Sequence, residues 1–347
     1  MKILFVISNL ANGGAERVIS VLSNELAKLG DEVHILYFEK NLGFYKYNAT
    51  LRHLNLYEKR SFLSKFSKFF KIRKSIKDIA PDAIISLMDQ TNINVIISTL
   101  FLRRTLIISE HTSQAALKSR FWRFARDFLY KFADALVVLN QKEKAYYSFL
   151  KNAKIIYNPL FSGDIQPQNT QKQNIILSVG RLEKVKNYEM YLDALSLIDA
   201  NILSSWRVLI AGSGSQEVIL KQKAKDLGLN VEFLGHCEDT SKLYESAKIL
   251  ALPSASESFG NVLIECLPYS CARIATKTHG ACELIIDEQD GILCDFSATD
   301  FSQKLSKLMQ DESLREKMAN NALLKLSEFK ADKIAREYKN LINECKK

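Results

Sequence analysis

Lys2-Ile3-Leu4-Phe5-Val6-Ile7-Ser8 is a run of mainly apolar residues, and the glycine-rich stretch Asn12-Gly13-Gly14-Ala15-Glu16-Arg17 follows it closely. A short apolar run that leads into glycines predicts a buried β-strand and then a tight turn. Apolar residues next recur at helical spacing over residues 15–29, the pattern stops at Gly30, and residues 33–38 have a strand pattern again. A strand, glycine turn, helix and second strand form the βαβ unit of a doubly wound parallel sheet, so we predict the α/β class.

The same alternation continues along the chain and is interrupted once, by the polar residues 158–173, which begin with Asn158-Pro159. Two such domains facing each other leave a cleft at the carboxyl ends of their strands, where open α/β sheets bind ligands. We predict an N-terminal Rossmann-like domain, a linker, a C-terminal Rossmann-like domain and a C-terminal helix that packs back on the N-terminal domain, at residues 1–160, 161–173, 174–325 and 326–347.

The charge of the chain is unevenly distributed. The 347 residues carry a net charge of +9 and are 47% hydrophobic, which suits two cores. Residues 1–165 contain 25 Lys and Arg against 14 Asp and Glu, whereas the rest contains 23 against 25. The basic half indicates an anionic partner, for which nucleic acid, an acidic membrane and a phosphorylated substrate are candidates.

Cysteine usage and hydropathy argue against several other classes of protein. The six cysteines form no C-x-x-C pair and the five histidines are scattered, so we expect no zinc site and read the thiols as reduced in a cytoplasmic protein. The apolar runs are strand-sized, far below the roughly 18–20 residues of a membrane-spanning helix. The N-terminus enters a strand pattern at once, so we expect no signal peptide.

Two glycine-rich turns follow predicted strands. Gly13 and Gly14 would let the backbone approach an anionic ligand at a helix start, although a purely structural turn explains them equally well. Gly212, within Ala211-Gly212-Ser213-Gly214-Ser215, has the same two explanations. The fingerprint G-x-G-x-x-G is absent, which argues against a nicotinamide-dependent oxidoreductase.

Two cations follow a strand of the second predicted domain. That strand ends at Gly180, and Arg181 and Lys186 come next. At the carboxyl end of a strand they could bind a diphosphate from two sides. The alternative is a pair of solvated surface charges, and their place at the strand end favours the binding site.

A pair of glutamates is the most specific motif. Glu257 and Glu265 flank a predicted helix start, with seven residues between them. Glu257, before the helix, can bind sugar hydroxyls, and Glu265, a little over two turns inside it, can reach the hydroxyls of a ribose. The N–H groups at Phe259, Gly260 and Asn261 would point at a phosphate between them. A helix-capping acid and an unrelated surface glutamate would explain Glu257 but not the combination.

The first domain supplies a histidine at a strand end. Ser109-Glu110-His111 closes a predicted strand, so His111 would face the cleft. It could bind a donor hydroxyl or be a buried, hydrogen-bonded residue.

A basic stretch in the same domain predicts an amphipathic helix. Residues 59–77 contain eight cations and no acid, more than solubility requires. The helix would place its apolar residues on one side and its cations on the other, and would either lie at an anionic membrane or bind phosphates. A sheet-covering helix with a solvated basic face is the alternative. The apolar residues are Phe62, Phe66, Phe69, Phe70, Ile72 and Ile76, and the opposing cations include Arg60, Lys68, Lys71 and Lys74.

Taken in order, these motifs resemble glycosyltransferase family 4 over nearly the whole chain. The matching elements are G-G-A-E-R at 13–17, S-E-H at 109–111, N-P at 158–159, V-G-R-L-x-x-x-K at 179–186, A-G-x-G at 211–214, F-L-G at 233–235 and the two glutamates. The resemblance implies a GT-B fold, a nucleotide-sugar donor and retention of anomeric configuration. Residues 106–111 and Trp122-Arg123-Phe124 are similar to the N-acetylgalactosamine transferases that build the lipid-linked heptasaccharide of bacterial (Campylobacter-type) N-linked glycosylation.

That likeness implies both substrates. The donor would be UDP-N-acetylgalactosamine, and the acceptor an undecaprenyl-diphosphate-linked oligosaccharide that is extended once or several times for protein N-glycosylation. The enzyme would be peripheral, on the anionic cytoplasmic face of the inner membrane, with no nucleic-acid partner. No D-x-D occurs in the chain, so we expect neither metal nor other cofactor. The acceptor-binding residues implied by the resemblance are Arg60, Lys65, Lys68, Lys71 and Lys74.

The remaining roles follow from the motifs and the resemblance together. Fixed positive groups would neutralise the departing UDP, while Glu257 and His111 position the sugar. The catalytic candidates are His111, Arg181, Lys186 and Glu257. The donor-binding candidates are Gly13, Gly14, Gly180, Arg181, Lys186, Gly212, Glu257, Phe259, Gly260, Asn261 and Glu265.

Departures from the family pattern concern the donor sugar. Ser258 replaces the glycine usual after the first glutamate, and Ala272-Arg273-Ile274 replaces the usual Pro-Val-Val. A family 4 transferase using UDP-glucose, UDP-galactose or UDP-GlcNAc for lipooligosaccharide or capsule is therefore an alternative. A UDP-sugar epimerase of the same fold gives the basic helix no role, and a nucleic-acid binder gives none to the glutamate pair.

Overall fold

The computed structural model describes residues 1–11, 13–56, 62–112, 119–161 and 172–346. For residues 62–66 it describes the backbone but not the side chains. The chain divides into two compact units. Unit 1 comprises Met1–Phe161 with Phe329–Lys347, and unit 2 comprises Ser162–Glu328. Most of the predicted linker, residues 161–173, therefore lies outside the described residues.

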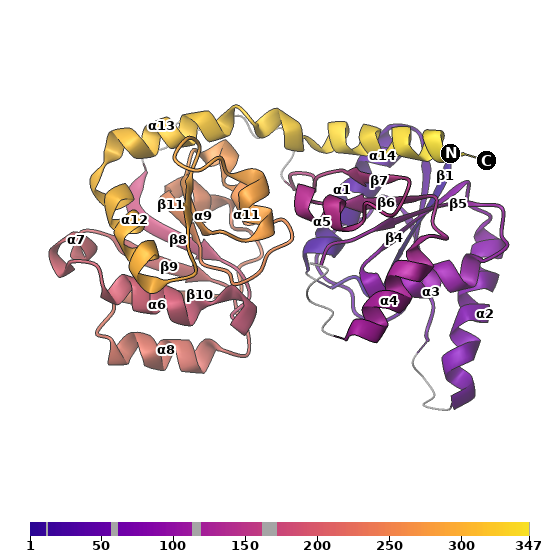
Figure 1. Ribbon diagram of the computed structural model, residues 1–347, viewed down its shortest axis with the longest axis horizontal. Coiled ribbons are helices and arrows are strands. Elements are labelled where there is room, and N and C mark those ends of the chain that lie inside the picture. The colour runs from indigo at the N-terminus through magenta and orange to yellow at the C-terminus, as the bar shows by residue number, and fades with distance from the viewer. Residues whose placement is uncertain (12, 57–61, 113–118, 162–171, 347) are drawn as a thin grey trace. The chain divides into compact units, whose positions relative to one another are not determined.

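Unit 1 is a seven-stranded parallel sheet in the order β3-β2-β1-β4-β5-β6-β7 (Figure 1). Its strands are β1 (Lys2–Ile7), β2 (Glu32–Tyr37), β3 (Thr50–His53), β4 (Ala83–Leu87), β5 (Thr105–Ser109), β6 (Ala135–Val138) and β7 (Ala153–Ile155). Its helices are α1 (Gly14–Lys28), α2 (Phe62–Ile79), α3 (Asp89–Thr99), α4 (Arg120–Tyr130), α5 (Gln141–Tyr146) and α14 (Ala331–Cys345).

Helices cover both faces of this sheet, because side chains of a strand alternate between its faces. Ile3, Phe5 and Ile7 pack in one core with α1 and α14, and Leu4 and Val6 pack in the other core with α2, α3 and α4. Figure 1 shows α14 and α2 on opposite sides of the strands. The last helix of the chain thus completes the first unit.

Unit 2 is a six-stranded parallel sheet in the order β10-β9-β8-β11-β12-β13. Its strands are β8 (Gln173–Val179), β9 (Arg207–Ala211), β10 (Val231–Gly235), β11 (Ala247–Leu252), β12 (Ala272–Thr276) and β13 (Ile292–Cys294). Its α-helices are α6 (Tyr188–Ser196), α7 (Ala200–Ser204), α8 (Glu217–Asp226), α9 (Ser241–Ser246), α10 (Val262–Glu265), α11 (His279–Leu284), α12 (Ala298–Gln310) and α13 (Glu312–Leu323). Short 3₁₀ turns lie at Lys184–Lys186, Leu267–Tyr269 and Leu326–Phe329.

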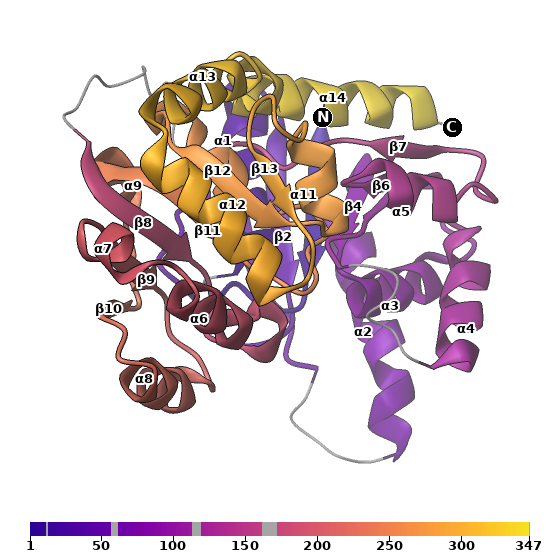
Figure 2. The ribbon, with the colours of Figure 1, turned by 60° about the vertical axis from the view of Figure 1, so that its left-hand side comes forward.

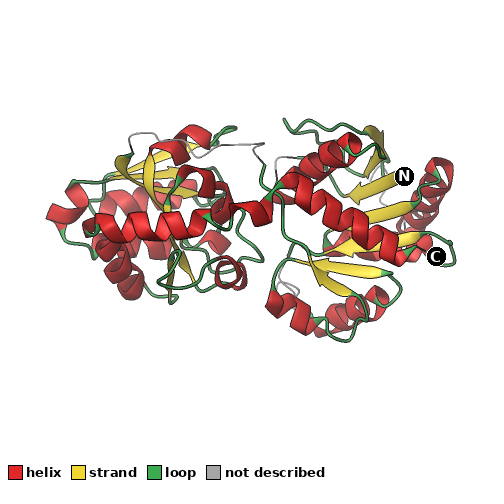
Figure 3. Ribbon diagram, turned by 90° about the horizontal axis from the view of Figure 1, so that it is seen from above, coloured by secondary structure: helices red, strands yellow, loops and turns green. Residues whose placement is uncertain are grey.

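The core of unit 2 joins α6, α8 and α12 to the sheet, and α6 packs along α12 (Figure 2). Seen from above, each sheet lies between helices (Figure 3). The predicted α/β class with two doubly wound parallel sheets is confirmed. The sequence pattern did not reveal β3 and β13, edge strands of four and three residues that are too short to produce a recognisable alternation.

Candidate active site

The carboxyl ends of β8 and β11 mark the topological switch point of unit 2. These strands are hydrogen-bonded neighbours, although β9 and β10 come between them in the sequence. The connections from the two strands therefore diverge, and the crevice that this leaves is the usual ligand site of open α/β sheets. Gly180 follows β8 and Glu257 follows β11, so these two sequence candidates lie at this point.

Lys186 and Glu257 form an ion pair across the switch point. Lys186 ends the 3₁₀ turn after β8, and its Nζ contacts Oε1 of Glu257. The hydroxyl of Ser254 donates to the same carboxylate oxygen over 2.9 Å. The backbone N–H of Ala255 donates to the carbonyl of Val185 over 2.8 Å, which ties the two loops together. Two predicted residues 71 positions apart are thus in direct contact.

Arg181 lies on the loop that carries Lys186, and its side chain is exposed. The loop is held to the neighbouring strand end, because Leu182 N–H donates to the carbonyl of Ser213 over 2.9 Å. Glu183 accepts from both the N–H and the hydroxyl of Ser215, at 3.0 and 2.8 Å. These bonds fix the backbone on which both cations are carried.

Gly212 is required by packing. Its φ is +143°, and a Cβ at this position would lie 2.0 Å from the carbonyl oxygen of Gly180. Only glycine accommodates that approach of two backbones. This structural explanation accounts for Gly212 without a ligand, so its predicted donor-binding role stays a prediction.

The segment between the two glutamates differs from the sequence interpretation. We placed Glu265 a little over two turns inside a helix, and this is wrong, because α10 begins at Val262 and Glu265 is its last residue. Pro268 follows in a 3₁₀ turn; it has no N–H, and its ring would clash with the carbonyl of a preceding helical turn. Gly260 precedes α10 with a φ of +88°, a left-handed conformation that favours glycine. The Phe259 side chain is buried, and Asn261 occupies the N-cap position of α10.

Glu265 is nonetheless a carboxylate held in place, at the end of α10. It is buried, and its Oε2 accepts a hydrogen bond of 3.0 Å from the phenol of Tyr244. Tyr244 comes from α9 and stacks on Tyr269, with ring centroids 5.8 Å apart. The sequence analysis missed Tyr244, because nothing in its local pattern connects it to Glu265.

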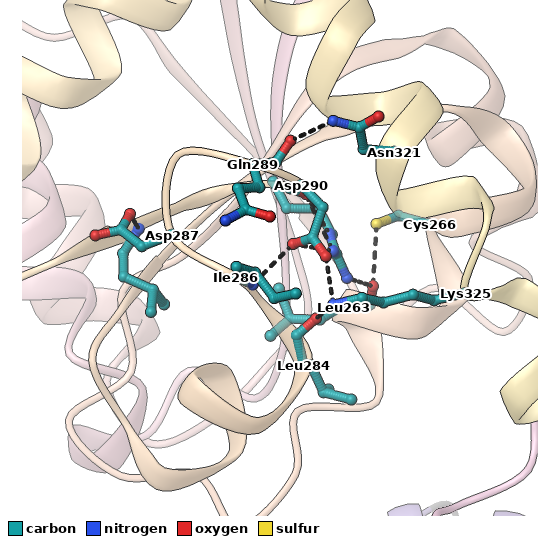
Figure 4. Close-up of polar contacts among 11 residues, drawn as sticks. Leu263, Cys266, Leu284, Ile286, Asp287, Gln289, Asp290, Asn321 and Lys325 are labelled. Carbon is teal, nitrogen blue, oxygen red and sulfur yellow. Dashed lines mark hydrogen bonds and ion pairs between the residues drawn. The ribbon is translucent and has the colours of Figure 1, made fainter.

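A buried ionic cluster is hydrogen-bonded to α10. Arg273, on β12, donates to the carbonyl of Leu263 over 3.1 Å and to both the carbonyl and Oδ1 of Asp290 over 3.0 Å. Lys325 pairs with Oδ2 of Asp290, and Figure 4 shows Asp290 between Ile286 and Lys325. Burial lowers the pKa of Arg273, while Asp290 opposes this shift. The departure from the family pattern at residue 273 thus has a structural role.

In unit 1, His111 lies just past the carboxyl end of β5. Its Nε2 is 3.1 Å from the hydroxyl of Ser109, which is itself 3.3 Å from the phenol of Tyr338 on α14. Burial lowers the pKa of His111 to about 4, so the imidazole is neutral near pH 7. A neutral imidazole can donate to or accept from a hydroxyl. The role of His111 toward the donor stays a prediction.

Glu110 lies in a buried polar network beside it. Its Oε1 accepts from the phenol of Tyr130 over 2.5 Å and from the amide of Asn92 over 3.1 Å. Burial raises the pKa of Glu110 to about 8, although the Tyr130 hydrogen bond lowers it. Glu110 is therefore largely protonated at pH 7.

At the start of unit 1, Gly13 is the N-cap of α1 and Gly14 its first residue. Asn12 lies outside the described residues. The predicted ligand contact of this turn stays a prediction.

Helix α2 presents part of the predicted basic face. Lys71 and Lys74 are exposed, Lys68 is half-buried, and burial lowers the pKa of Lys68. Ile72 and Ile76 are buried as predicted, but Phe70 is 73% exposed and does not belong to the apolar side. At about 100° per residue, Phe70 lies roughly 160° from Ile72. Arg60 is outside the described residues, as are the side chains of Lys65, Phe62 and Phe66.

The described residues form neither a cluster of metal-binding side chains nor a membrane-spanning helix. The described side chains contain no group of three or more His, Cys, Asp or Glu placed to hold a metal ion. Over the same ranges, no helix has the length and hydropathy needed to cross a bilayer.

Comparison with known proteins matches both units to family models. Residues 12–160 match Glycosyltransferase Family 4, and residues 164–325 match Glycosyl transferases group 1. The chain is 39% identical, over 100% of its length and 99% of the relative's, to a Campylobacter jejuni GalNAc-α-(1→4)-GalNAc-α-(1→3)-diNAcBac-PP-undecaprenol α-1,4-N-acetyl-D-galactosaminyltransferase. It is 28% identical, over 97% of its length and 98% of the relative's, to the C. jejuni N-acetylgalactosamine-N,N′-diacetylbacillosaminyl-diphospho-undecaprenol 4-α-N-acetylgalactosaminyltransferase.

A solved structure shares the fold. Anabaena HepE, in complex with UDP and glucose, matches with a TM-score of 0.83 and 19% identity, over 99% of this chain and 100% of that one. The predicted GT-B architecture and the family resemblance are confirmed. This protein is a glycosyltransferase and belongs to the family whose members join a family 4 N-terminal domain to a group 1 C-terminal domain.

Proposed function

We propose that this enzyme transfers N-acetylgalactosamine from UDP-N-acetylgalactosamine to an undecaprenyl-diphosphate-linked oligosaccharide, in one or several steps, for protein N-glycosylation. The observation that carries the proposal is the 39% identity, over the full length of both chains, to a transferase whose name specifies this sugar and this kind of acceptor. The 28% match to a second transferase of the same kind supports it.

The switch point of unit 2 suits the donor diphosphate. Lys186 and Arg181 bring positive charge to the carboxyl end of β8, and a diphosphate could replace Glu257 as the partner of Lys186. Lys186 and Ser254 both donate to Oε1 of Glu257. In this proposal, Oε2 of Glu257 binds a sugar hydroxyl. Glu265, held by Tyr244, would bind the ribose. Fixed charges stabilise a leaving group without reorganising.

The chemical step retains the anomeric configuration. The acceptor hydroxyl attacks the anomeric carbon from the face that UDP leaves, the C–O bond to the diphosphate breaks, and a donor phosphate oxygen takes the hydroxyl proton. Lys186 and Arg181 stabilise the charge that develops on UDP. The scheme uses no metal ion.

The acceptor would bind unit 1. Its diphosphate, esterified at both ends, carries two negative charges, and the exposed cations of α2 include Lys71 and Lys74. The net positive charge of residues 1–165 also favours an anionic membrane surface. We therefore place the enzyme peripherally on the cytoplasmic face of the inner membrane, where the lipid-linked acceptor is displayed.

One assay tests the proposal. The purified protein is incubated with a panel of UDP-sugars and a polyprenyl-diphosphate oligosaccharide, and the glycan is sized by mass spectrometry. We expect mass increments of N-acetylhexosamine from UDP-N-acetylgalactosamine alone. Transfer from UDP-glucose, UDP-galactose or UDP-GlcNAc instead would reassign the donor, and UDP-sugar isomerisation without acceptor would refute the transferase reaction.

A further inference from the structure

Helix α4 of unit 1 is packed with its apolar face outward. Five aromatic residues on this helix and just beyond its end are between 51% and 72% exposed: Phe121, Trp122, Phe124, Phe128 and Phe132. At about 100° per residue, they cover one side of the helix. The side that faces the protein carries Arg126 and Tyr130, which are almost completely buried.

The buried arginine fixes this orientation. Arg126 donates to Asp127 through Nε and Nη2, at 3.0 and 2.9 Å, and its guanidinium lies 5.5–5.9 Å from the ring centroids of Tyr130, Tyr146 and Tyr147. Tyr146 in turn donates to Asp127 over 2.6 Å. Rotating α4 to bury its aromatic rings would break this network, and the charges of Arg126 and Asp127 would become exposed or would lose their partners. The outward aromatic face is therefore a built feature of the unit.

Such a face is unfavourable in water and calls for a partner. Contiguous exposed aromatic side chains typically mark a protein or membrane interaction site. Aromatic rings with cations beside them are typical of helices that lie in the headgroup region of a bilayer.

The charges around the face select an anionic partner. Arg120 on α4 and Lys131 just past its end are exposed, whereas the one acid of α4, Asp127, is paired with Arg126. On the same side of the sheet, exposed Phe70 stands on α2 with Lys74 one helical turn away. A second copy of this surface would bring like charges together, so an anionic lipid surface fits better than self-association.

We propose that the aromatic face of α4 inserts into the interface of an anionic membrane. The rings would lie at headgroup level, and Arg120 and Lys131 would contact lipid phosphates. The inference rests on the proposed function in that the acceptor is carried by a lipid. It adds to that function by naming the surface that brings unit 1 to the bilayer.

The fluorescence of Trp122 offers a direct test. The chain has two tryptophans, and Trp206 is buried in unit 2, so a Trp206→Phe variant reports on Trp122 alone. We expect a blue shift when vesicles of phosphatidylglycerol and phosphatidylcholine are added, and quenching by lipids brominated near the headgroup. Vesicles of phosphatidylcholine alone should bind more weakly, because the electrostatic attraction is lost.

Variants on exposed positions separate binding from folding. In the Trp206→Phe background, Phe124→Glu with Phe128→Glu should weaken vesicle binding at least about tenfold. Thermal unfolding should change little, because Phe124 is 72% exposed and Phe128 52% exposed. The matched control places glutamates at exposed apolar positions of unit 2, Val218→Glu with Ile219→Glu, and should bind as its parent does.

Three results would overturn the inference: no binding to anionic vesicles, binding that survives the α4 double variant, or a dimer in solution that the double variant dissolves without any vesicle binding. Because the vesicles contain no acceptor, these outcomes are independent of the transfer reaction. Vesicle binding without sugar transfer would refute the proposed function and leave this inference intact.

Discussion

The phenolic O–H of Tyr244 donates a hydrogen bond of 3.0 Å to Oε2 of Glu265, from a helix that ends 19 residues before the glutamate. This bond fixes one oxygen of the carboxylate that we assign to the donor ribose. A tyrosine outside every recognisable motif therefore positions a motif residue.

Tyr244→Phe should raise KM for the UDP-sugar about tenfold and change kcat little. The variant keeps the ring packing but loses a hydrogen bond to a charged group, and tenfold corresponds to about 1.4 kcal/mol. Steady-state kinetics check this, with Tyr269→Phe as a control that preserves the stacked pair. With a donor that lacks the ribose 2′ and 3′ hydroxyls, the variant and the wild type should have the same KM. An equal penalty with that donor would mean that Tyr244 acts through general stability and not through the ribose.

Lys186→Ala should lower kcat by roughly two to three orders of magnitude, because it removes a fixed charge from the leaving diphosphate. Single-turnover rates with saturating donor measure this. Lys184→Ala, an exposed lysine of the same 3₁₀ turn, is the matched control and should be nearly silent. If both variants lost activity equally, the assignment of Lys186 to the diphosphate would be wrong.

Removal of divalent cations should leave the rate within about twofold, since the proposed stabilisation comes from side chains. The assay compares protein treated with EDTA and passed over a chelating resin with the same protein after Mg²⁺ or Mn²⁺ is restored. Strong inhibition that either ion reverses would contradict the metal-free scheme.

Glu110→Gln should make the stability of the enzyme less sensitive to pH. Burial raises the pKa of Glu110 from 4.5 to about 8, so the folded state binds a proton that the unfolded state has released. The resulting stabilisation is fully present below about pH 4.5, falls as pH rises, and is gone above about 8, at no more than ~1.4 kcal/mol per pH unit. Urea denaturation at about pH 7, 7.7 and 8.5 should show a decline for the wild type that is smaller in the variant.

The control for this experiment is Glu39→Gln, at an exposed position. His111 contributes with the opposite sign, because its pKa is lowered to about 4 and stability rises with pH between about 4 and its unfolded value of 6.5. Measurements above pH 6.5 therefore isolate Glu110. An identical decline in the Gln variant would show that Glu110 is ionised in the folded protein.

Arg273→Met should destabilise unit 2 by about 3–5 kcal/mol, because it removes one partner from a buried ionic cluster. Adding Asp290→Asn should recover part of the loss, since the amide oxygen can still accept from the N–H of Ile286. Free energies of unfolding from urea titrations measure both effects. If the free energy of unfolding of the Arg273→Met variant were within about 1 kcal/mol of the wild-type value, Lys325 alone would neutralise Asp290.

Local sequence patterns were enough to predict the class of the fold and the strand ends at which several candidate residues lie. The hydrophobic patterns of strands (period two) and helices (period 3.6) can be recognised locally in the sequence. In a parallel sheet the carboxyl ends of all strands lie at the same edge, so a residue just past a predicted strand is expected at that edge. Gly180, Lys186 and Glu257 were found in this way. The order of the strands, and with it the contact between Lys186 and Glu257 at the switch point, is tertiary.

The tertiary structure alone decided which side chains support the site and which face outward. Tyr244, Arg273 and Tyr338 act on residues that are distant in the chain, and no local period encodes such contacts. The orientation of α4 is a further case: its pattern shows an apolar face, but only the buried network of Arg126 and its tyrosines turns that face to the outside. Hydrophobic periodicity specifies that a helix has two faces, whereas packing and charge pairing decide which of them is buried.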